Sequence, residues 1–163
     1  MLELGAPIGC VTDSSPSLIR IEISGAEEFE KHKSKLGVGQ YLLIASGNSL
    51  HLLSTITAVR ASHTERSHGS GDAEVGGDAE AVAFRFQVDT QPIGTLSDES
   101  EFTRGSHSLP VPTEFAYVTP PEVLSSIFSH QIKSPFPLGT LSIAPEVRFD
   151  IDGDRFFSKH VAV

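Results

Sequence analysis

Short segments with apolar residues at alternate positions recur along the chain, and they constrain its fold more than any other feature. In "SLIRIEIS" (17–24), Ile19, Ile21 and Ile23 share one face of an extended strand. Glycine, proline, serine or asparagine separates most of these segments, as is typical of turns between short strands. The segments that we predict as strands are 7–12, 17–24, 38–45, 50–60, 81–89, 91–96, 113–119, 138–144, 146–152 and 154–163.

Two other patterns complete the predicted secondary structure. Gly47-Asn48 separates two apolar runs and predicts a tight β-hairpin turn. A helix is predicted over about 120–130, with Thr119 as its cap and a proline in its first turn. The polar segment 25–36 suits a turn or two of helix, and 102–112 is predicted as a loop. The apolar face of the late helix comprises Val123, Leu124, Ile127 and Phe128.

About ten short strands and one late helix predict a mostly β fold. We expect residues 1–163 to form one domain, a small closed or nearly closed antiparallel β-barrel. A chain of 163 residues can bury about two-thirds of its unfolded surface, so it needs no disulfide or metal to fold. The single cysteine, Cys10, excludes an internal disulfide and is expected to be a small buried residue.

Residues 61–81 break the strand pattern. Their composition is dominated by Gly, Asp, Glu, Ser and His, and Val75 is the only sizeable apolar residue. Such a segment buries too little apolar surface to offset its ordering entropy, so we predict a flexible acidic loop. His63 and His68 have acidic neighbours there, which leaves a metal site as the alternative to a solvated loop.

The charge of the chain disfavours a surface that binds nucleic acid directly. The formal net charge is −9, and the one basic cluster, Lys31, Lys33 and Lys35, follows Glu27, Glu28 and Glu30. We predict that these charges pair within a short solvated segment. No apolar run approaches 18 residues and no signal peptide is present, so we expect no membrane contact and a cytoplasmic location.

The motifs that commonly carry chemistry give weak signals. Asp150, Asp152 and Asp154 alternate as calcium ligands do, but Asp152-Gly153 is also a favoured hairpin turn, which we prefer. His107 lies between two serines, without a nucleophile elbow or a phosphate-binding loop elsewhere. We therefore expect no catalytic, metal-binding or cofactor-binding residue in this chain.

Six short motifs follow one another in a distinctive order. They are "IGCVT", "GQYLLI", "QPIG", "FTRGSHSLPVP", "LGTL" and "DRFFSKHVAV". In this order they resemble the N-terminal barrel of HerA-type hexameric ATPases, called the HAS barrel because HerA and the F-type ATP synthase subunits share it. The step Pro92-Ile93-Gly94, the spacing from Gly105 to Pro112 and the terminal residues carry the resemblance, which spans nearly the whole chain.

The resemblance implies that a motor domain follows the barrel. In that family a phosphate-binding loop for ATP and Mg²⁺ comes shortly after the barrel, so 154–163 is expected to lead into an ATPase domain that this chain lacks. The candidate junction to that domain consists of Lys159, His160, Val161, Ala162 and Val163.

The resemblance also implies an assembly role without catalysis. HerA-like proteins form hexameric rings that move DNA, and their barrels pack on neighbouring copies and dock a nuclease or a sirtuin-like effector. DNA is then contacted only through the motor, in DNA end processing or antiphage defence. The candidate interface residues, in two apolar loops that either contact partners or close the ends of the barrel, are Leu109, Pro110, Val111, Pro112, Pro135, Phe136, Pro137 and Leu138.

Two departures from the family and two rival functions stay open. The family often carries a glycine where this chain has Thr113, and 61–81 is longer than a minimal barrel needs. One rival is a freestanding module that binds a protein or single-stranded nucleic acid, although we expect the phenylalanines that would stack on bases to point inward. The other is a metal-dependent hydrolase built on the three aspartates near the end of the chain. The phenylalanines are Phe84, Phe86, Phe102 and Phe115.

Overall fold

The structure, a computed structural model, describes residues 4–46, 50–64, 83–97, 101–106, 108–129 and 132–158. The first part of the chain forms β1 (Gly9–Ser14), β2 (Ile19–Ile23), α1 (Ala26–His32), the 3-10 helix η1 (Lys33–Lys35), β3 (Tyr41–Ala45), β4 (Leu50–Thr64) and β5 (Ala83–Ser97). The second part forms β6 (Phe102–Arg104), β7 (Phe115–Val118), α2 (Pro121–Ser129), β8 (Pro135–Leu141), β9 (Ala144–Asp152) and α3 (Gly153–Phe157). No helix of the described residues is long and apolar enough to cross a membrane.

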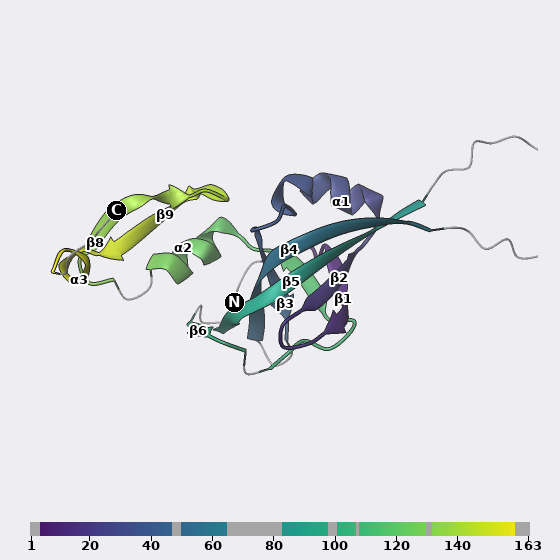
Figure 1. Cartoon of the computed structure of the whole chain (residues 1–163), viewed down its shortest axis with the longest axis horizontal. Helices are drawn as coiled ribbons and strands as arrows, with labels where there is room; N and C mark the ends of the chain where they lie inside the picture. The colour runs from purple at the N-terminus through teal and green to yellow at the C-terminus, as the bar shows by residue number, and fades with distance from the viewer. Residues whose placement is uncertain are drawn as a thin grey trace, which may run out of the picture.

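Six antiparallel strands close into a barrel, as the sequence predicted. They pair in the order β2-β1-β7-β3-β4-β5, and β5 then pairs with β2 to complete the circle. β6 adds to β5 outside this circle (Figure 1). Since each strand of the circle has a neighbour on both sides, the barrel has few free edges.

The core of the barrel comes from strand faces with a period of two residues. Ile19, Ile21 and Ile23 of β2 are all buried and belong to one cluster, whereas Arg20 and Glu22 lie between them on the outer face. The other buried members of this cluster are Ile8, Val11, Leu36, Leu42, Ile44, Leu52, Ile56, Val88 and Ala116.

β3 and β4 are buried on both faces, which explains their continuous apolar runs. Leu42 and Ile44 point into the barrel, while Leu43 lies in a second cluster with Val123 of α2. On α2, Leu124 belongs instead to a third cluster with Val147 of β9. α2 therefore joins the barrel to the hairpin of β8 and β9, which lies beyond it (Figure 1).

The hairpin of β8 and β9 has an unusual free edge. Gly153 donates its backbone N–H to the Ser134 carbonyl at 2.8 Å, and the ladder then pairs Phe136 with Ile151. Because backbone groups of alternate residues point to the same side of a strand, the nitrogens of Pro135 and Pro137 face away from β9. Proline carries no N–H, so the outer edge of β8 lacks a donor at both positions.

Two glycines permit close approaches that the barrel requires. A Cβ on Gly9 would lie 2.1 Å from the carbonyl oxygen of Glu22 on the neighbouring strand. A Cβ on Gly94 would lie 2.5 Å from the ring of Phe102 and 2.6 Å from the carbonyl oxygen of Thr103. Side chains at these positions would displace β2 and β6 respectively.

Several predicted boundaries are wrong. Residues 61–64, predicted as part of the flexible loop, extend β4 because they pair with β5. Residues 102–104 form β6 rather than a loop. Residues 83–89 and 91–96, predicted within two separate strands, belong to one strand, β5. Pro92 is tolerated there because it lies between the pairings of β5 with β2 and with β6, where β5 has no neighbour on that edge. The predicted turn at 47–48 and most of the 61–81 segment (65–81) lie outside the described residues.

The end of the chain differs most from the prediction. Asp152-Gly153 is not a hairpin turn: the Asp152 carboxylate caps α3 by accepting from the N–H of Arg155 at 3.2 Å. Residues 154–157 are therefore helical rather than extended, and the candidate junction at 159–163 lies outside the described residues. α1 confirms the turn or two of helix predicted within 25–36, and α2 confirms the late helix, whereas α3 is a short helix that was not predicted.

Thr119 does not cap α2. The backbone N–H groups of Val123 and Leu124 donate to the Pro120 carbonyl at 3.1 and 3.3 Å, so Pro120 precedes the first turn and Thr119 lies one residue further out. Its buried hydroxyl has no hydrogen-bond partner. The cap prediction was wrong because the two prolines that follow Thr119 have no N–H to donate.

Candidate functional site

The hairpin and the short helix α3 that follows it carry a cluster of exposed apolar side chains. The exposed fractions are 41% for Phe136, 55% for Leu138 and 61% for Phe157. The rings of Phe136 and Phe157 meet edge to face with centroids 4.9 Å apart. We call these three residues the hairpin surface; contiguous exposed apolar groups of this kind mark sites of interaction.

The aspartates near this surface serve the local structure. Asp150 accepts from Arg148 Nε at 2.8 Å, and Asp154 accepts from the Ser134 hydroxyl at 2.6 Å. Asp152, as described, caps α3, which places Phe157 against Phe136. Among the described residues no three His, Cys, Asp or Glu side chains gather as metal ligands would.

A second exposed apolar surface lies at the turn before β7. Glu114 donates its N–H to the Val111 carbonyl at 3.2 Å, and its carboxylate accepts from the Val111 N–H at 2.9 Å. Thr113, between them, has a φ of 80°, which is costly for a β-branched residue. The exposed fraction is 61% for Val111 and 52% for Phe115. We call Val111, Pro112 and Phe115 the β7-turn surface.

Four of the eight predicted interface residues, Val111, Pro112, Phe136 and Leu138, belong to these two surfaces, which the structure does not bring together. Of 109–112, Leu109 is half-buried and Pro110 is buried, so only Val111 and Pro112 are exposed. Residues 135–138 are exposed as predicted, but they form the start of β8 rather than a loop. The hairpin surface lies beyond α2, whereas the β7-turn surface belongs to the barrel.

The four phenylalanines expected to point inward do not all do so. The exposed fraction of Phe84 is 43%, and Phe115 is also exposed, whereas Phe86 and Phe102 are half-buried. Phe86 stacks on Phe29 of α1 with ring centroids 4.0 Å apart. The alternation along β5 correctly placed Phe84 and Phe86 on one face. Phe84 is nevertheless exposed, because it lies beyond the residues of β5 that pair with β2.

Phe84 and His63 form a small exposed aromatic pair at the far end of β4 and β5. Their rings lie with centroids 4.7 Å apart, and the two residues are direct partners in the ladder. His68 and His107 lie outside the described residues.

Two of the three lysines of α1 and η1 pair locally, as predicted, whereas Lys35 forms no ion pair within the part of the chain that the structure describes. Lys31 contacts Glu28 at 3.4 Å and Lys33 contacts Glu30 at 3.1 Å. Exposed pairs of this kind contribute little to stability, at most about 1 kcal/mol each. Cys10 is half-buried rather than fully buried, since it lies on β1 with its side chain away from the core.

The strongest electrostatic interaction lies at the seam that closes the barrel. Asp89 is 3% exposed and accepts from Arg20 Nε at 2.8 Å and from Arg60. The hydrogen bond from Arg20, and then that from Arg60, hold the pKa of Asp89 below its ordinary value, although burial opposes them. The same pairing raises the pKa of Arg20. This network ties β2, β4 and β5 together.

Sequence reasoning missed two contributors to these surfaces. Phe157 was predicted in a strand; the signal for a helix was Asp152 followed by a second acid, Asp154, in the first turn. Phe115 was predicted to point into the barrel. It lies two residues after the exposed Thr113 and next to the buried Ala116, so alternation along the strand places Phe115 on the outer face.

A scan against models of protein families finds no match to the chain, and a search of curated proteins finds none either. Of the two surfaces, the one on the hairpin has more exposed aromatic area and lies on a separate projecting element.

Proposed function

We propose that the chain is the non-catalytic N-terminal assembly and docking barrel of a HerA-type hexameric DNA-translocating ATPase. The observation that carries the proposal is a closed barrel joined through α2 to a projecting hairpin, on which Phe136 and Leu138 are exposed beside Phe157 of α3. A closed barrel is a rigid platform with few free edges, and exposed aromatic side chains are the usual anchors of protein interfaces.

The residues that suggested the resemblance occupy constrained positions, which supports the proposal. Pro92 lies where β5 changes its neighbour, and Gly94 permits the close approach of β6. Thr113, where the family often has glycine, has the positive φ that glycine favours. The departure at Thr113 is thus compatible with the same turn.

The roles of the partners follow from this proposal. The hairpin surface docks a nuclease or a sirtuin-like effector, or a neighbouring copy in the ring. ATP and Mg²⁺ are bound downstream of Val163 by the motor, which also contacts the DNA. The protein then works in the cytoplasm, in DNA end processing or antiphage defence.

The reading frame beyond Val163 tests the proposal directly. We expect a phosphate-binding loop of the form GxxxxGK[ST] to begin within about ten residues. A stop codon at that place, together with a stable monomeric product, would reject the motor and favour a freestanding module.

Substitutions on the hairpin surface test the docking role in the full-length protein. Phe136→Ser with Leu138→Ser should weaken ring assembly or effector binding at least about tenfold, because each truncated interface anchor costs 1–2 kcal/mol or more. Val38→Ser is the matched control, since Val38 is 67% exposed but lies outside both surfaces. Analytical ultracentrifugation with and without the effector measures both; equal behaviour of the two variants would refute the role of this surface.

A second candidate function rests on the pair formed by Phe84 and His63. Exposed rings can stack on bases, so a freestanding module for single-stranded nucleic acid is the alternative. Fluorescence anisotropy with an oligothymidylate tests it: Phe84→Ala should weaken binding, and Phe115→Ala, at an even more exposed ring elsewhere, should not. The net charge of −9 opposes this function, and the absence of micromolar binding at low salt would remove it.

A further inference from the structure

A hollow that is open to solvent lies beside β8, close to the turn of the hairpin. Its cavity volume is about 260 Å³, and its lining includes two leucines and a phenylalanine. We call this space the β8 hollow; the residues that line it are Leu138, Gly139, Thr140, Leu141, Ser142 and Phe149. An apolar cavity of about 150 Å³ can hold a benzene molecule, so the β8 hollow has room for the ring of a phenylalanine.

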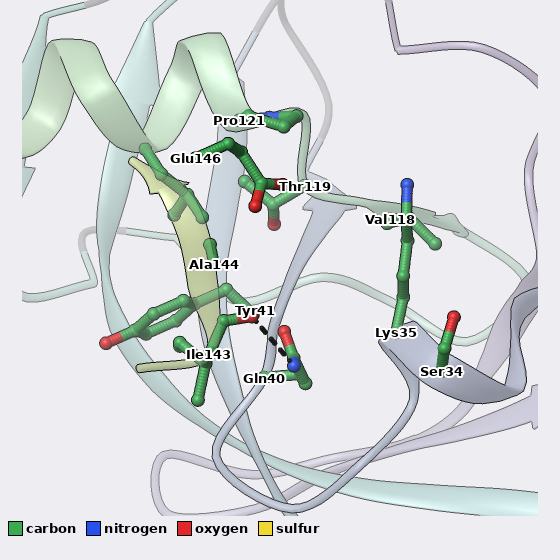
Figure 2. Close-up of a pocket in the computed structure, with 11 residues that line it drawn as sticks. Ser34, Lys35, Gln40, Tyr41, Val118, Thr119, Pro121, Ile143, Ala144 and Glu146 are labelled. Atoms are coloured by element: carbon green, nitrogen blue, oxygen red, sulfur yellow. Dashed lines mark hydrogen bonds between the residues drawn. The ribbon is translucent and has the colours of Figure 1, made fainter. Parts of the chain in front are cut away.

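The walls of the β8 hollow are fixed by the joint between the hairpin and the barrel. The ring of Phe149 meets that of Phe128 on α2 with centroids 5.9 Å apart, and Leu141 packs against the third cluster. Next to the hollow, the Gln40 amide nitrogen donates to the Ile143 carbonyl at 3.0 Å, the bond drawn dashed in Figure 2. Side chains that are already held in place lose little freedom when the hollow is filled, which favours binding.

Gly139 keeps the β8 hollow open, and nothing in the described structure requires a glycine at this position. Its φ lies outside the left-handed range, and a Cβ added to it would meet no atom within 4 Å. At Gly9 and Gly94, by contrast, an added Cβ would overlap a neighbouring strand. A glycine inside a strand weakens the strand and often marks a place where another group approaches closely. At Gly139 that group must come from another molecule.

Phe115 is an exposed ring without a partner. Its exposed fraction is 52%, and its partner across the ladder with β1 is Cys10, a small side chain that cannot cover it. The other exposed phenylalanines of the described residues each contact a second ring, as Phe84 contacts His63 and Phe136 contacts Phe157. Phe115 makes no such contact within the described part of the chain, so its ring is available to another molecule.

The turn that presents Phe115 is strained, as functional positions often are. Pro112 and Thr113 are its central residues, and the Glu114 N–H closes it by donating to the Val111 carbonyl at 3.2 Å. Glycine would adopt the φ of 80° found at Thr113 without strain. Strain of this kind persists mainly where it serves an interaction. Thr113 and Gly139 therefore both lower stability without an evident benefit inside the chain, one beside a free ring and the other beneath an empty hollow.

We propose that the Phe115 ring of one copy of this chain enters the β8 hollow of a second copy. The ring lies on the barrel and the hollow on the hairpin, so each contact is head to tail and leaves one free ring and one free hollow. Such a contact continues from copy to copy and closes into a ring where the rotation permits. The inference rests on the proposed assembly role, for which it names the two surfaces that meet.

The charge of the chain predicts how this contact responds to salt. Each copy has a net charge of −9, so two copies repel each other, whereas the side chains that meet are apolar. Salt screens the repulsion and leaves the apolar contact intact, so self-association should strengthen as salt is added.

Sedimentation velocity of the 163-residue chain, over a range of protein concentrations at low and high salt, tests the contact. So small an interface is expected to give micromolar to millimolar association and species larger than dimers. A monomer at every protein concentration up to about 1 mM would overturn the proposal. Association that weakens as salt is added would overturn its apolar character.

Two variants determine which surfaces meet. Phe115→Ser removes the ring and keeps the hollow, whereas Gly139→Leu fills the hollow and keeps the ring. Each change alone should weaken association at least about tenfold, and Phe84→Ser, at a ring outside both surfaces, should not. An equimolar mixture of the first two variants should form dimers and nothing larger, because the ring of one fits the open hollow of the other. A mixture that stays monomeric would overturn the proposal.

Controls separate this contact from folding and from the motor. Thermal denaturation checks that each variant is folded, and Gly139→Ala, whose methyl group meets no other atom within 4 Å, should weaken association less than Gly139→Leu does. Wild-type association in both Gly139 variants would overturn the proposal. The reading frame beyond Val163 tests the motor independently, so a phosphate-binding loop there without this contact would overturn the present inference alone.

Discussion

Single side chains decide whether the barrel closes, and Asp89 is the clearest case. It is buried on β5 where that strand pairs with β2, and it receives hydrogen bonds from arginines on both neighbouring strands. Both arginine side chains keep part of their surface in water, 33% for Arg20 and 53% for Arg60. The buried carboxylate is thus paired without full burial of its partners, so the network need not bear the whole desolvation cost of three ions.

Asp89→Asn should lower the free energy of unfolding by about 1–3 kcal/mol near pH 7, because charge-assisted hydrogen bonds at the seam are weakened. The pKa of Asp89 is lowered by folding, so its contribution is full well above the ordinary value of 3.8 and is lost as the pH falls below it. Urea denaturation of both proteins at about pH 7 and pH 3 measures this. The difference between them should shrink at the lower pH; a constant difference would contradict the role of the ionised carboxylate.

Thr113→Gly should stabilise the protein by about 0.5–1 kcal/mol, an unusual direction for a change to glycine. The φ of 80° is strained for threonine, and its relief exceeds the entropy that glycine adds to the unfolded chain. Thr113→Ala is the control, because alanine keeps the Cβ that causes the strain. Thermal denaturation compares the three proteins, and a higher midpoint for alanine than for glycine would exclude backbone strain as the cause.

At the scale of elements, α2 and β5 each connect two other parts of the molecule. α2 packs Val123 against the barrel and Leu124 against the hairpin. β5 pairs with β4 along its length and with β2 and then β6 on its other edge. Pro92 and Gly94 lie at that change of neighbour, so β6 depends on the local backbone of β5.

Gly94→Ala should destabilise the protein by about 1–3 kcal/mol and detach β6, because the new methyl group would overlap the ring of Phe102. Gly139→Ala is a matched control: Gly139 is also in a strand, but nothing lies within 4 Å of the position its Cβ would take. Denaturant unfolding gives the energies, and the amide exchange rates of 102–104 report β6 itself. Equal effects of the two changes would show that β6 does not depend on the close approach.

The sequence predicted correctly those elements in which the spacing of apolar residues reflects the burial of a single face. The alternation in β2 reflects one buried face, and both the strand and its core residues were correct. β6 was missed because three residues are too short to show a period, and its partner β5 is distant in sequence. α3 was missed because Asp-Gly begins a helix or a hairpin turn equally well. The pocket beside α2, lined among others by Ser34, Gln40, Thr119 and Glu146, combines distant parts of the chain (Figure 2), so no local pattern indicates it.

At the scale of the whole molecule, barrel and hairpin form two units with a narrow connection. Beyond the packing of α2, their one direct hydrogen bond among the described residues runs from Gln40 to the Ile143 carbonyl. Tyr41 also contacts the third cluster, which includes Leu124 and Val147. Limited contact of this kind allows the hairpin to open without the barrel, since local unfolding follows the least packed boundary.

Gln40→Ala should therefore speed amide exchange in β8 and β9 several-fold and leave β1 to β5 unchanged, because one net hydrogen bond of about 1 kcal/mol is lost at the joint. Gln91→Ala, an exposed change on β5, serves as the control. Hydrogen exchange followed by mass spectrometry resolves the two units. Uniform acceleration over both would indicate that they unfold together.

The two prolines of β8 have a consequence for the protein at high concentration. An unpaired strand beside exposed phenylalanines would ordinarily recruit the same strand from other molecules and start a fibril. Pro135 and Pro137 remove the amide hydrogens that such stacking would use, while Phe136 and Leu138 stay accessible. The hairpin can thus offer its side chains to a partner while this edge of its backbone offers no amide hydrogen at either proline, which limits unwanted strand pairing between identical molecules.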